Sequence, residues 1–518
     1  MHQNQSNRIY TDCSIATVDE TFVEKLKISA EAIMRTMGPW GKNVFITTPF
    51  GAVVSTKDGV TVARNLVFKE RVAQLATMLL IDSCRKTEIE AGDGTTTAAA
   101  LVYGMIKSHD PNKAIDHYQV ARDLKNLAID IENRIKLMST ELKTKQQLYY
   151  IAKISCNGNE SLARVISDAV WINGSLGKVL VTPGDKDGLE YVEGYSYKPG
   201  VIHKAFLGGG TKIMVKKPRI IMCTDKLTDF EEIKTLLASF PNSPAILICD
   251  DLQGSALSTA IANFRNGNHN VIPVHCPYTG QRRKEVMEDI ASMMDGELVI
   301  YDKMNGLTFK DHFKLSDNNG YMDSVTVMED SVIFNKQGDR SERVKYIMEY
   351  IESKEESFKN NEDLKNFHES RIVKLEKGTS SVVVGCNTEV EKEDKMRSAD
   401  DAILACQSAL KSGFVTGGGT VFFNLSNDDS LFEGVSVEAR DILRSGLREP
   451  IKRIFGIDES RFPEDLEFES GQVYDRNWNI VNDDTVIDPA LVLISAMKNA
   501  ISVVAEIITS HDIIFIHD

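Results

Sequence analysis

The middle of the chain alternates short apolar runs with helix-like stretches, and this alternation constrains the fold more than any other feature. The apolar runs have the length of buried strands and lie at 219–223, 245–249, 271–275 and 298–301. Helical patterns separate these runs near 229–240, 255–265 and 282–294. Strand–helix–strand repeats pair their strands in parallel and place helices on the sheet faces, so we predict an inserted α/β domain.

The segments on either side of this region are mainly helical. We predict helices at 17–38, 60–90, 120–138 and 390–412, a further helix after the sequence AGDG, and strands at 43–48, 52–56, 380–385 and 512–516. The Lys- and Glu-rich segment 340–378 predicts two solvated helices. The first third of the chain has no complete core of its own and is expected to fold with the last third. The terminal strand is apolar on both faces, so we expect it to pair with a neighbouring subunit.

The composition argues against several classes of function. The 518 residues include 60 basic and 75 acidic side chains, which gives a formal charge of −15. Phosphates repel such a chain, so we expect neither nucleic acid nor a membrane as a partner. Eight scattered cysteines without a C-x-x-C pair indicate free thiols. With no signal peptide and no run of about 18 apolar residues, a cytoplasmic location is expected, in the host cytoplasm if the protein is viral.

The most informative local motif is AGDGTTT at 91–97, which directly precedes a predicted helix. A helix N-terminus offers unpaired N–H groups, and glycines allow the backbone to approach a phosphate closely. The acidic Asp93 fits this setting if a divalent cation lies between the carboxylate and the phosphates. A tight turn with Thr95 as an ordinary helix cap is the alternative. The Walker A pattern is absent from the sequence.

Two other carboxylates lie in suggestive surroundings. Asp58 follows a predicted strand in the sequence Lys57-Asp58-Gly59, and Asp401 lies within a predicted helix. Taken alone, an aspartate on a helix is usually solvated, and the Gly38-Pro39 pair is only a helix stop.

Six sequence blocks together make the chain similar to a known family. They are TMGPWGKNV at 36–44, TKDGVTVAR at 56–64, AGDGTTTAA at 91–99, VEGYSYKPG at 192–200, GQRRKEVMEDIASMMDG at 280–296 and DDAILACQSALKSGFVTGGGT at 400–420. Their order and spacing resemble those of the group I (GroEL-type) chaperonins over nearly the full length. The resemblance implies an α/β multidomain chaperonin fold. Its domains would be a mainly helical equatorial domain (1–139 and 412–518), a small intermediate hinge domain (140–192 and 379–411) and an inserted α/β apical domain (193–378).

The resemblance also implies a nucleotide site and a role for each position in it. Asp401 matches the residue that orients and activates the attacking water, and Asp58 matches its helper. The metal positions are Asp93 for Mg²⁺ and Thr36, Lys57 (through its carbonyl) and Thr96 for K⁺. The other nucleotide-binding positions are Gly38, Pro39, Gly94, Thr95, Thr97, Ile154, Ser155, Gly418 and Asp488. The implied cofactors are therefore ATP, Mg²⁺ and K⁺, and the implied reaction is ATP hydrolysis.

By the same resemblance, the inserted domain binds unfolded client proteins on exposed apolar side chains. The matching apolar positions are Val201, Phe206, Leu237, Leu257 and Ile261, with His203, Ala205, Lys234 and Ala262 beside them. The alternative interpretation is that these apolar side chains pack in the core of the domain. The subunits are expected to form a homo-oligomeric ring of about seven copies around a folding cavity.

The chain departs from the family pattern at several points. Trp40 stands where the family usually has Lys, and Lys234 replaces an apolar groove position, which puts docking of a co-chaperonin in doubt. Gln472 stands in the place of an Asn beside the adenine, and a shortened segment before it suggests weakened contact between rings, so that single rings occur. Two rival hypotheses are a protein-binding scaffold without turnover and a small-molecule kinase.

Overall fold

The computed structural model describes residues 13–38, 41–47, 53–192, 194–239, 244–267, 270–294, 300–301, 320–335, 340–358, 361–377, 379–386, 389–456, 466–475 and 477–516. The chain divides into two compact units. Unit 1 comprises Met1–Ser175, Val181–Leu189 and Val382–Asp518, and unit 2 comprises Leu176–Leu180 and Glu190–Ser381. Strands β4 (Val179–Gly184), β5 (Gly188–Val192) and β16 (Thr379–Gly385) form the sheet along which the chain passes between the units. This division does not separate an equatorial from an intermediate domain, so the three-domain boundaries stay a prediction.

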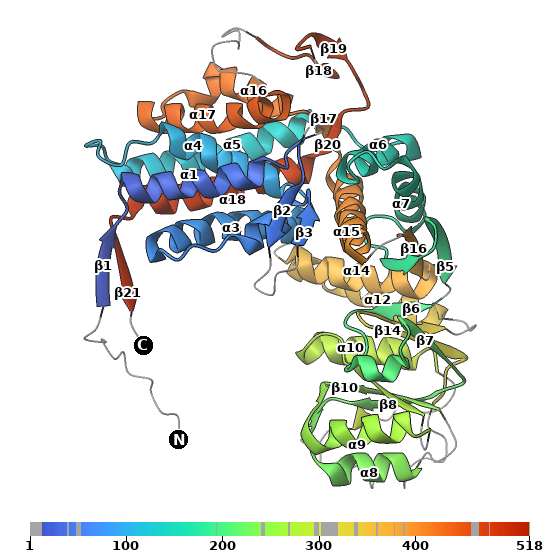
Figure 1. Cartoon of the computed structure of the whole chain (residues 1–518). Helices are drawn as coiled ribbons and strands as arrows, with labels where there is room; N and C mark the ends of the chain where they lie inside the picture. The colour runs from blue at the N-terminus through green and yellow to red at the C-terminus, as the bar shows by residue number, and fades with distance from the viewer. Residues whose placement is uncertain are drawn as a thin grey trace. The chain divides into compact units, whose positions relative to one another are not determined.

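Unit 1 is built on long helices that lie side by side (Figure 1). They are α1 (Glu20–Met34), α3 (Arg71–Ala91), α4 (Thr95–Ser108), α5 (His117–Met138), α17 (Val437–Phe455) and α18 (Ala490–Thr509). Helix α5 shows why such a helix packs here, because its apolar residues recur every three or four positions and form one buried face. The first and last thirds of the chain share this core, as the sequence predicted.

Helix α18 lies at the centre of this core, between α3, α4 and α5. It is apolar on nearly all sides. Judged by its length and composition alone, it could cross a membrane. Of its most apolar 18-residue window, however, 78% is buried inside the protein. No apolar stretch of this length was expected from the sequence, and the position of α18 in the core explains why the helix is so apolar.

The two chain ends pair with each other. Strand β1 (Cys13–Thr17) runs antiparallel to β21 (Asp512–Ile516), with Ile15 opposite Ile514. The expectation that the terminal strand pairs is confirmed, with β1 of the same chain as its partner, and pairing with a neighbouring subunit stays a prediction. The ribbon keeps apolar side chains outside, with Ile15 70% and Ile514 64% exposed.

Unit 1 contains further elements beside these helices, and among them α15 is itself a long helix. They are β2 (Val44–Thr47), β3 (Val53–Thr56), α2 (Gly59–Asn65), α6 (Lys145–Ser155), α7 (Glu160–Asn173), α15 (Glu389–Ser412), β17 (Phe414–Thr416), α16 (Thr420–Asn427), η3 (Asp429–Phe432), β18 (Gln472–Tyr474), β19 (Ile480–Asn482) and β20 (Ile487–Pro489). The single helix predicted over 60–90 is wrong, because the chain leaves the helix after Asn65. The Phe68 N–H donates to the Gln74 side chain at 2.8 Å there, and α3 begins at Arg71.

Unit 2 contains the predicted α/β domain. Its first sheet has the order β12 (Val271–His275), β10 (Ala245–Cys249), β8 (Arg219–Cys223) and β13 (Ile300–Tyr301). All three pairings are parallel, which confirms the prediction from the apolar runs. The intervening helices are α8 (Phe230–Ser239), α9 (Gly254–Arg265) and α10 (Gly280–Ala291), and two short strands, β9 (Lys226–Leu227) and β11 (Asp251–Leu252), pair beside them.

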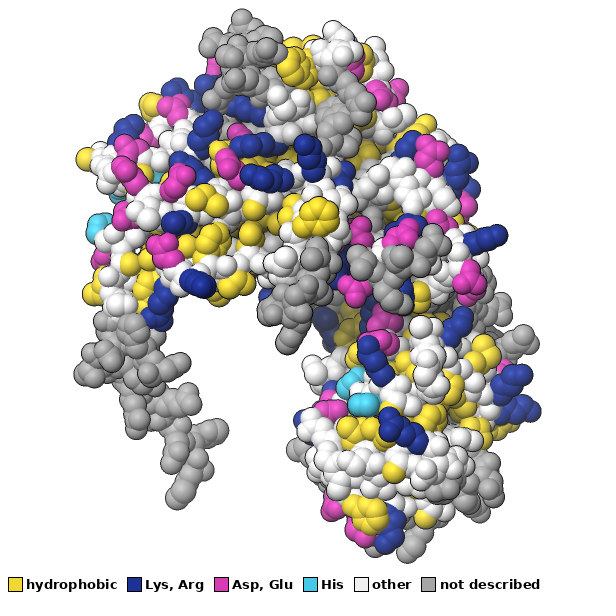
Figure 2. Space-filling model, in the orientation of Figure 1, with side chains coloured by type: hydrophobic (Ala, Val, Ile, Leu, Met, Phe, Trp, Pro, Cys, Tyr) yellow, Lys and Arg dark blue, Asp and Glu magenta, His cyan; other side chains and the backbone are white. Residues whose placement is uncertain are grey.

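A second sheet in unit 2 is antiparallel. It has the order β6 (Tyr195–Tyr197), β15 (Val332–Asn335), β14 (Ser324–Met328) and β7 (Lys212–Lys216). The 3-10 turn η1 (Lys204–Leu207) and the helices α12 (Ser341–Ser353), α13 (Glu355–Phe358) and α14 (Glu362–Lys377) complete the unit. On the face shown in Figure 2, acidic and basic side chains of the described residues are interspersed.

The prediction that 340–378 forms two solvated helices is wrong for α14. Arg371 on this helix is 3% exposed and donates two hydrogen bonds, at 2.6 and 2.8 Å, to the fully buried carboxylate of Asp289. Arg343 on α12 donates a third, at 2.8 Å. A Lys- and Glu-rich composition indicated solvent exposure, but charges that are paired and hydrogen-bonded can be buried.

Candidate active site

A cavity of about 750 Å³ in unit 1 brings the predicted nucleotide-site residues together. The predicted residues that line it are Thr36, Gly38, Lys57, Asp58, Asp93, Gly94, Thr95, Thr96, Thr97, Ile154, Ser155, Asp401, Gly418 and Asp488. Pro39 and Trp40 lie outside the described residues. The lining residues come from separate parts of the chain that sequence spacing alone could not bring together.

The floor of the cavity is the turn between α3 and α4. Gly92 and Gly94 have φ values of 78° and 94°, which L side chains rarely adopt. The space is also restricted, because a Cβ on Gly94 would come within 2.7 Å of a Val492 methyl group and one on Gly92 within 2.0 Å of Leu404. Glycine at these positions therefore lets the backbone turn directly into Thr95, the first residue of α4. The unpaired N–H groups of that helix end favour an anion.

Asp93 is held in this turn by two hydrogen bonds. The Gly94 N–H donates to Oδ1 at 2.5 Å, and the Ser155 hydroxyl on α6 donates to Oδ2 at 2.8 Å. Burial raises the pKa of Asp93 more strongly than these bonds lower it. The carboxylate is thus oriented into a site where its negative charge is unfavourable without a cation.

Other carboxylates face the same cavity. Burial, and then the charges of Asp93, Asp58 and Glu88, raise the pKa of Asp401 on α15 well above its ordinary value. Burial and the charge of Asp93 raise the pKa of Asp488 on β20 to about 7. Asp401 makes no ion pair within the part of the chain that the structure describes. Such a cluster stores electrostatic repulsion that a bound cation would relieve.

Asp58 lies where β3 leads into α2. Both the N–H and the hydroxyl of Thr61 donate to its Oδ2, at 3.0 and 2.6 Å. The carboxylate therefore caps α2 and lines the cavity at the same time. Lys57 beside it is half-buried, and burial lowers its pKa.

The opposite wall combines the glycine turn at 417–419 with aromatic side chains. Gly418 has φ 69°, and a Cβ there would lie 3.6 Å from the ring of Phe455. The rings of Phe455 and Tyr474 meet edge to face with centroids 5.7 Å apart. This wall is suited to a flat or apolar ligand group. Gln472, which was expected beside the base, does not line the cavity, and its side chain accepts from the Glu469 N–H at 2.9 Å.

Several residues that line the cavity were not predicted from the sequence. They are Glu88, Tyr150, Lys153, Asp394, Ser398, Phe455, Val473 and Tyr474. Helical spacing could have indicated some of them. Ser398 and Asp394 lie three and seven positions before Asp401, so they share its face of α15.

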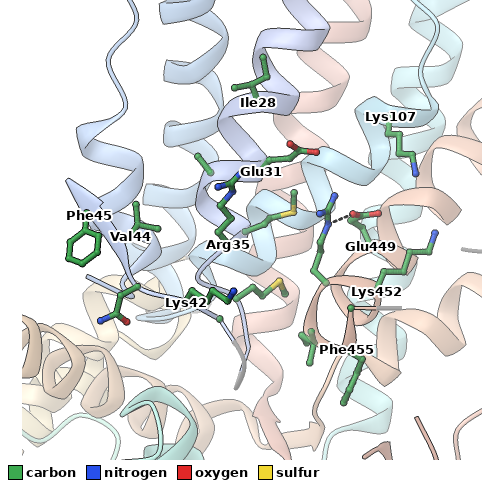
Figure 3. A pocket seen from close by; sticks show the side chains of 18 of the residues that line it. Ile28, Glu31, Arg35, Lys42, Val44, Phe45, Lys107, Glu449, Lys452 and Phe455 are labelled. Carbon is green, nitrogen blue, oxygen red and sulfur yellow. Dashed lines mark hydrogen bonds and ion pairs between the residues drawn. The ribbon is translucent and has the colours of Figure 1, made fainter. Parts of the chain in front are cut away.

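A larger cavity of about 1460 Å³ lies beside the first and shares Met37, Ile454 and Phe455 with it (Figure 3). Its charged side chains are Glu31, Arg35, Lys42, Lys107, Glu449, Lys452 and Arg453, with Glu449 and Arg453 paired at 2.5 Å. None of the predicted catalytic or nucleotide-binding residues lines it. The smaller cavity is therefore the candidate active site.

The expected client-binding residues are mostly not exposed. Val201, Phe206 and Leu237 are buried in the core of unit 2, so the expectation of exposed side chains is wrong for these three. Phe206 packs edge to face on Phe264 at 5.4 Å, and Val201 bridges to Val274 of the parallel sheet. Leu257 and Ile261 on α9 are only partly buried.

Comparison with known proteins agrees with this architecture. A model of the TCP-1/cpn60 chaperonin family matches residues 30–240, which include the glycine turn before α4. The chain is thus similar to this family over residues 30–240, and its fold is that of a solved chaperonin. The similar solved structures include the chaperonin gp146 from bacteriophage EL 2 (Pseudomonas aeruginosa), crystallised in the presence of ATP-BeFx.

The similarity to gp146 extends over nearly the whole length of both chains. The two sequences are 21% identical, and the match covers 97% of this chain and 99% of that one. The TM-score is 0.70 for crystal form II and 0.68 for crystal form I. At this identity the comparison establishes the shared fold.

Proposed function

We propose that this protein is a chaperonin driven by Mg²⁺-dependent ATP hydrolysis in the cavity of unit 1. The observation that carries the proposal is the convergence of Asp93, Asp401 and Asp58 around the glycine turn before α4. Two carboxylates with raised pKa values beside a helix N-terminus suit a site for a metal-bound polyphosphate. The similarity to gp146, which was crystallised with an ATP analogue, supports the same ligand class.

The residues present fit a nucleotide. The N–H groups at the start of α4 and the hydroxyls of Thr95, Thr96 and Thr97 would bind phosphate oxygens. Gly418 and the Phe455 ring would contact the base and ribose across the cavity. Asp488 would accept hydrogen bonds from the ribose hydroxyls. Its carboxylate lies close to the same glycine turn, since a Cβ added to Gly417 would be 3.1 Å from it.

The residues also fit Mg²⁺. No group of three or more His, Cys, Asp or Glu side chains among the described residues could hold a metal alone. Mg²⁺ commonly takes one or two carboxylates and completes its shell with substrate phosphates and water, so Asp93 suffices as the protein ligand. When bound, the ion would neutralise charge that develops on the phosphates. For K⁺, we propose the Thr36 and Thr96 oxygens and the Lys57 carbonyl as ligands.

Asp401 would orient and deprotonate the attacking water, and Asp58 would assist it. A carboxyl with a raised pKa is a stronger base once ionised than an ordinary surface aspartate. Bound cations would favour its ionised form and so prepare it only in the loaded site. Asp401 lies on α15, which starts after β16, whereas the phosphate cradle lies between α3 and α4. Movement of α15 would therefore couple hydrolysis to a change of shape.

We further propose that unit 2 captures unfolded proteins and that subunits assemble into a ring of about seven copies. Leu257 and Ile261 on α9 remain the candidates for client contact. Partly buried apolar side chains on one helix face can bind unrelated apolar segments by burial. We expect the protein to act in the cytoplasm, and the need for a co-chaperonin stays open to test.

Phosphate release in steady state, with and without a chemically unfolded protein, tests the proposed function. We expect Mg²⁺-dependent ATP hydrolysis whose rate changes when the unfolded protein is added. ATP binding without phosphate release would instead favour a passive scaffold. Saturable phosphorylation of a small molecule would favour a kinase.

A further inference from the structure

Helix α15 presents one polar face to the turn that carries Asp58. Asp394, Arg397 and Asp401 are three and four positions apart, which places them on one face of the helix. Asp394 and Asp401 line the candidate active site, whereas Arg397 lies between them and reaches the turn itself. Neither Asp394 nor Arg397 was among the residues predicted from the sequence.

Two hydrogen bonds attach this face to the two ends of the turn. The Thr56 hydroxyl donates to Oδ1 of Asp394 at 3.0 Å, and Nη1 of Arg397 donates to the Thr61 hydroxyl at 2.6 Å. Thr56 and Thr61 are both buried, so these bonds are protected from water. A hydrogen bond that uses a charged donor or acceptor is stronger than a neutral one.

Thr61 links Arg397 to Asp58. A threonine hydroxyl has one proton to donate and lone pairs to accept. Here it accepts from Arg397 and donates to Oδ2 of Asp58 at 2.6 Å. The contact with Arg397 therefore orients the Thr61 proton toward the carboxylate, and polarisation along the chain strengthens both bonds.

We propose that Arg397 is a positioning residue for ATP hydrolysis, acting through Thr61 on Asp58 and holding α15 against the active-site turn. This inference rests on the proposed function. In the ionised form that hydrolysis requires, Asp401 repels Asp58, and this repulsion favours separation of α15 from the turn. The Arg397–Thr61 bond opposes that separation and sets where the two carboxylates stand relative to each other.

The alternative partner of Arg397 is weak. Its Nη2 lies 3.5 Å from Glu393 on the same helix, and 67% of the Glu393 side chain is exposed. Exposed ion pairs four residues apart on a helix contribute little. Glu393→Gln therefore removes the surface pair and keeps the Thr61 contact, which makes it a matched control for Arg397→Ala.

The test measures single-turnover ATP hydrolysis, the Kd of a fluorescent ATP analogue and the Tm for six proteins. These are the wild type, Arg397→Ala, Arg397→Lys, Thr61→Val and the Arg397→Ala/Thr61→Val double variant, with Glu393→Gln as the control. We expect Arg397→Ala to slow hydrolysis about tenfold or more, because the variant loses one charged hydrogen bond, and to change the Kd less than about twofold. Arg397→Lys should recover part of the rate, and the double variant should be no slower than the slower single variant.

The outcomes separate this inference from the proposed function. If the wild type hydrolyses ATP and Arg397→Ala does so at the same rate, the positioning role is overturned while the proposed function stands. Equal losses of rate and affinity without rescue by Lys would show a structural role only and also overturn it. If the wild type binds the analogue but never releases phosphate, the proposed function fails and this inference fails with it.

Discussion

The hydroxyl of Ser155 donates a hydrogen bond of 2.8 Å to Oδ2 of Asp93, a residue 62 positions earlier in the chain. This bond connects the end of α6 to the glycine turn before α4. It lowers the pKa of a carboxyl that burial raises, and so favours the charged form that a metal ion needs. One side chain thereby joins two segments of the candidate active site and adjusts its electrostatics.

Removal of this hydroxyl should weaken metal-dependent nucleotide binding. In Ser155→Ala, Asp93 loses one of two hydrogen bonds, so we expect the Mg²⁺-dependent affinity for ATP to fall about fivefold. Isothermal titration with and without Mg²⁺ measures the effect. Exposed Ser161→Ala at the start of α7 is the control. An unchanged affinity would show that the bond does not support the metal ligand.

The glycine turn should not tolerate a methyl group. Gly94→Ala combines an unfavourable φ of 94° with a contact of 2.7 Å to Val492, so we expect loss of ATP binding. Gly434→Ala is the matched control, because Gly434 has φ 75° with no atom within 4 Å of its Cβ. That variant should show only the backbone cost of about 1–2 kcal/mol in denaturant unfolding. Equal ATP affinity in the two variants would contradict the role of the turn.

The stability of the nucleotide-free protein should depend on pH through Asp488. Its pKa is about 7 in the folded chain against an ordinary value of 3.8, so the folded state binds more protons between these values. The free energy of unfolding must then fall as the pH rises from about 4 through about 7. We expect Asp488→Asn to raise the Tm at pH 8 and to change it little at pH 4.

Thermal unfolding of both proteins across this pH range measures the difference. Asp484→Asn, on an exposed neighbour, is the control and should follow the wild type. A Tm gain for Asp488→Asn that is equal at pH 4 and pH 8 would mean that the effect does not come from the ionisation of this carboxyl.

The buried ion network of unit 2 should be sensitive to loss of one partner. Arg371→Leu leaves the Asp289 carboxylate, which is 0% exposed, without two of its three close donors. Breaking such a pair costs about 3–5 kcal/mol of unfolding free energy. Lys365→Leu on the same helix removes only a surface pair of 3.6 Å with Glu369 and should cost less than about 1 kcal/mol. Denaturant unfolding compares them, and similar costs would argue against a structural role for the network.

Sequence patterns predicted the parts of this fold that local chemistry determines. The apolar runs that became β8, β10 and β12 are buried strands with helices between them, and that periodicity is visible without a structure. The antiparallel sheet of β6, β7, β14 and β15 was not predicted, because β7 pairs with β14 and β6 pairs with β15 across more than a hundred residues of sequence. The burial of Arg371 was missed because pairing with Asp289 is invisible in composition.

The candidate site likewise contains residues that sequence patterns predicted and residues that they did not. Asp93, Asp58 and Asp401 were predicted from motifs and a family resemblance, and the cavity brings all three together. Arg397 and Thr61 were not predicted, because a hydrogen bond between residues 336 positions apart leaves no local pattern. The client-binding prediction was wrong for Phe206 and Leu237, since apolar residues look alike in sequence whether they face a core or a client.

The central claim is that ATP hydrolysis depends on the Asp401 carboxylate, and steady-state phosphate release by Asp401→Ala tests it most directly. Asp400→Ala, at the neighbouring position outside the cavity lining, is the control. We expect Asp401→Ala to lose at least about a hundredfold in rate while it binds ATP and assembles like the wild type, and the control to stay active. Hydrolysis by Asp401→Ala at the wild-type rate would contradict the account.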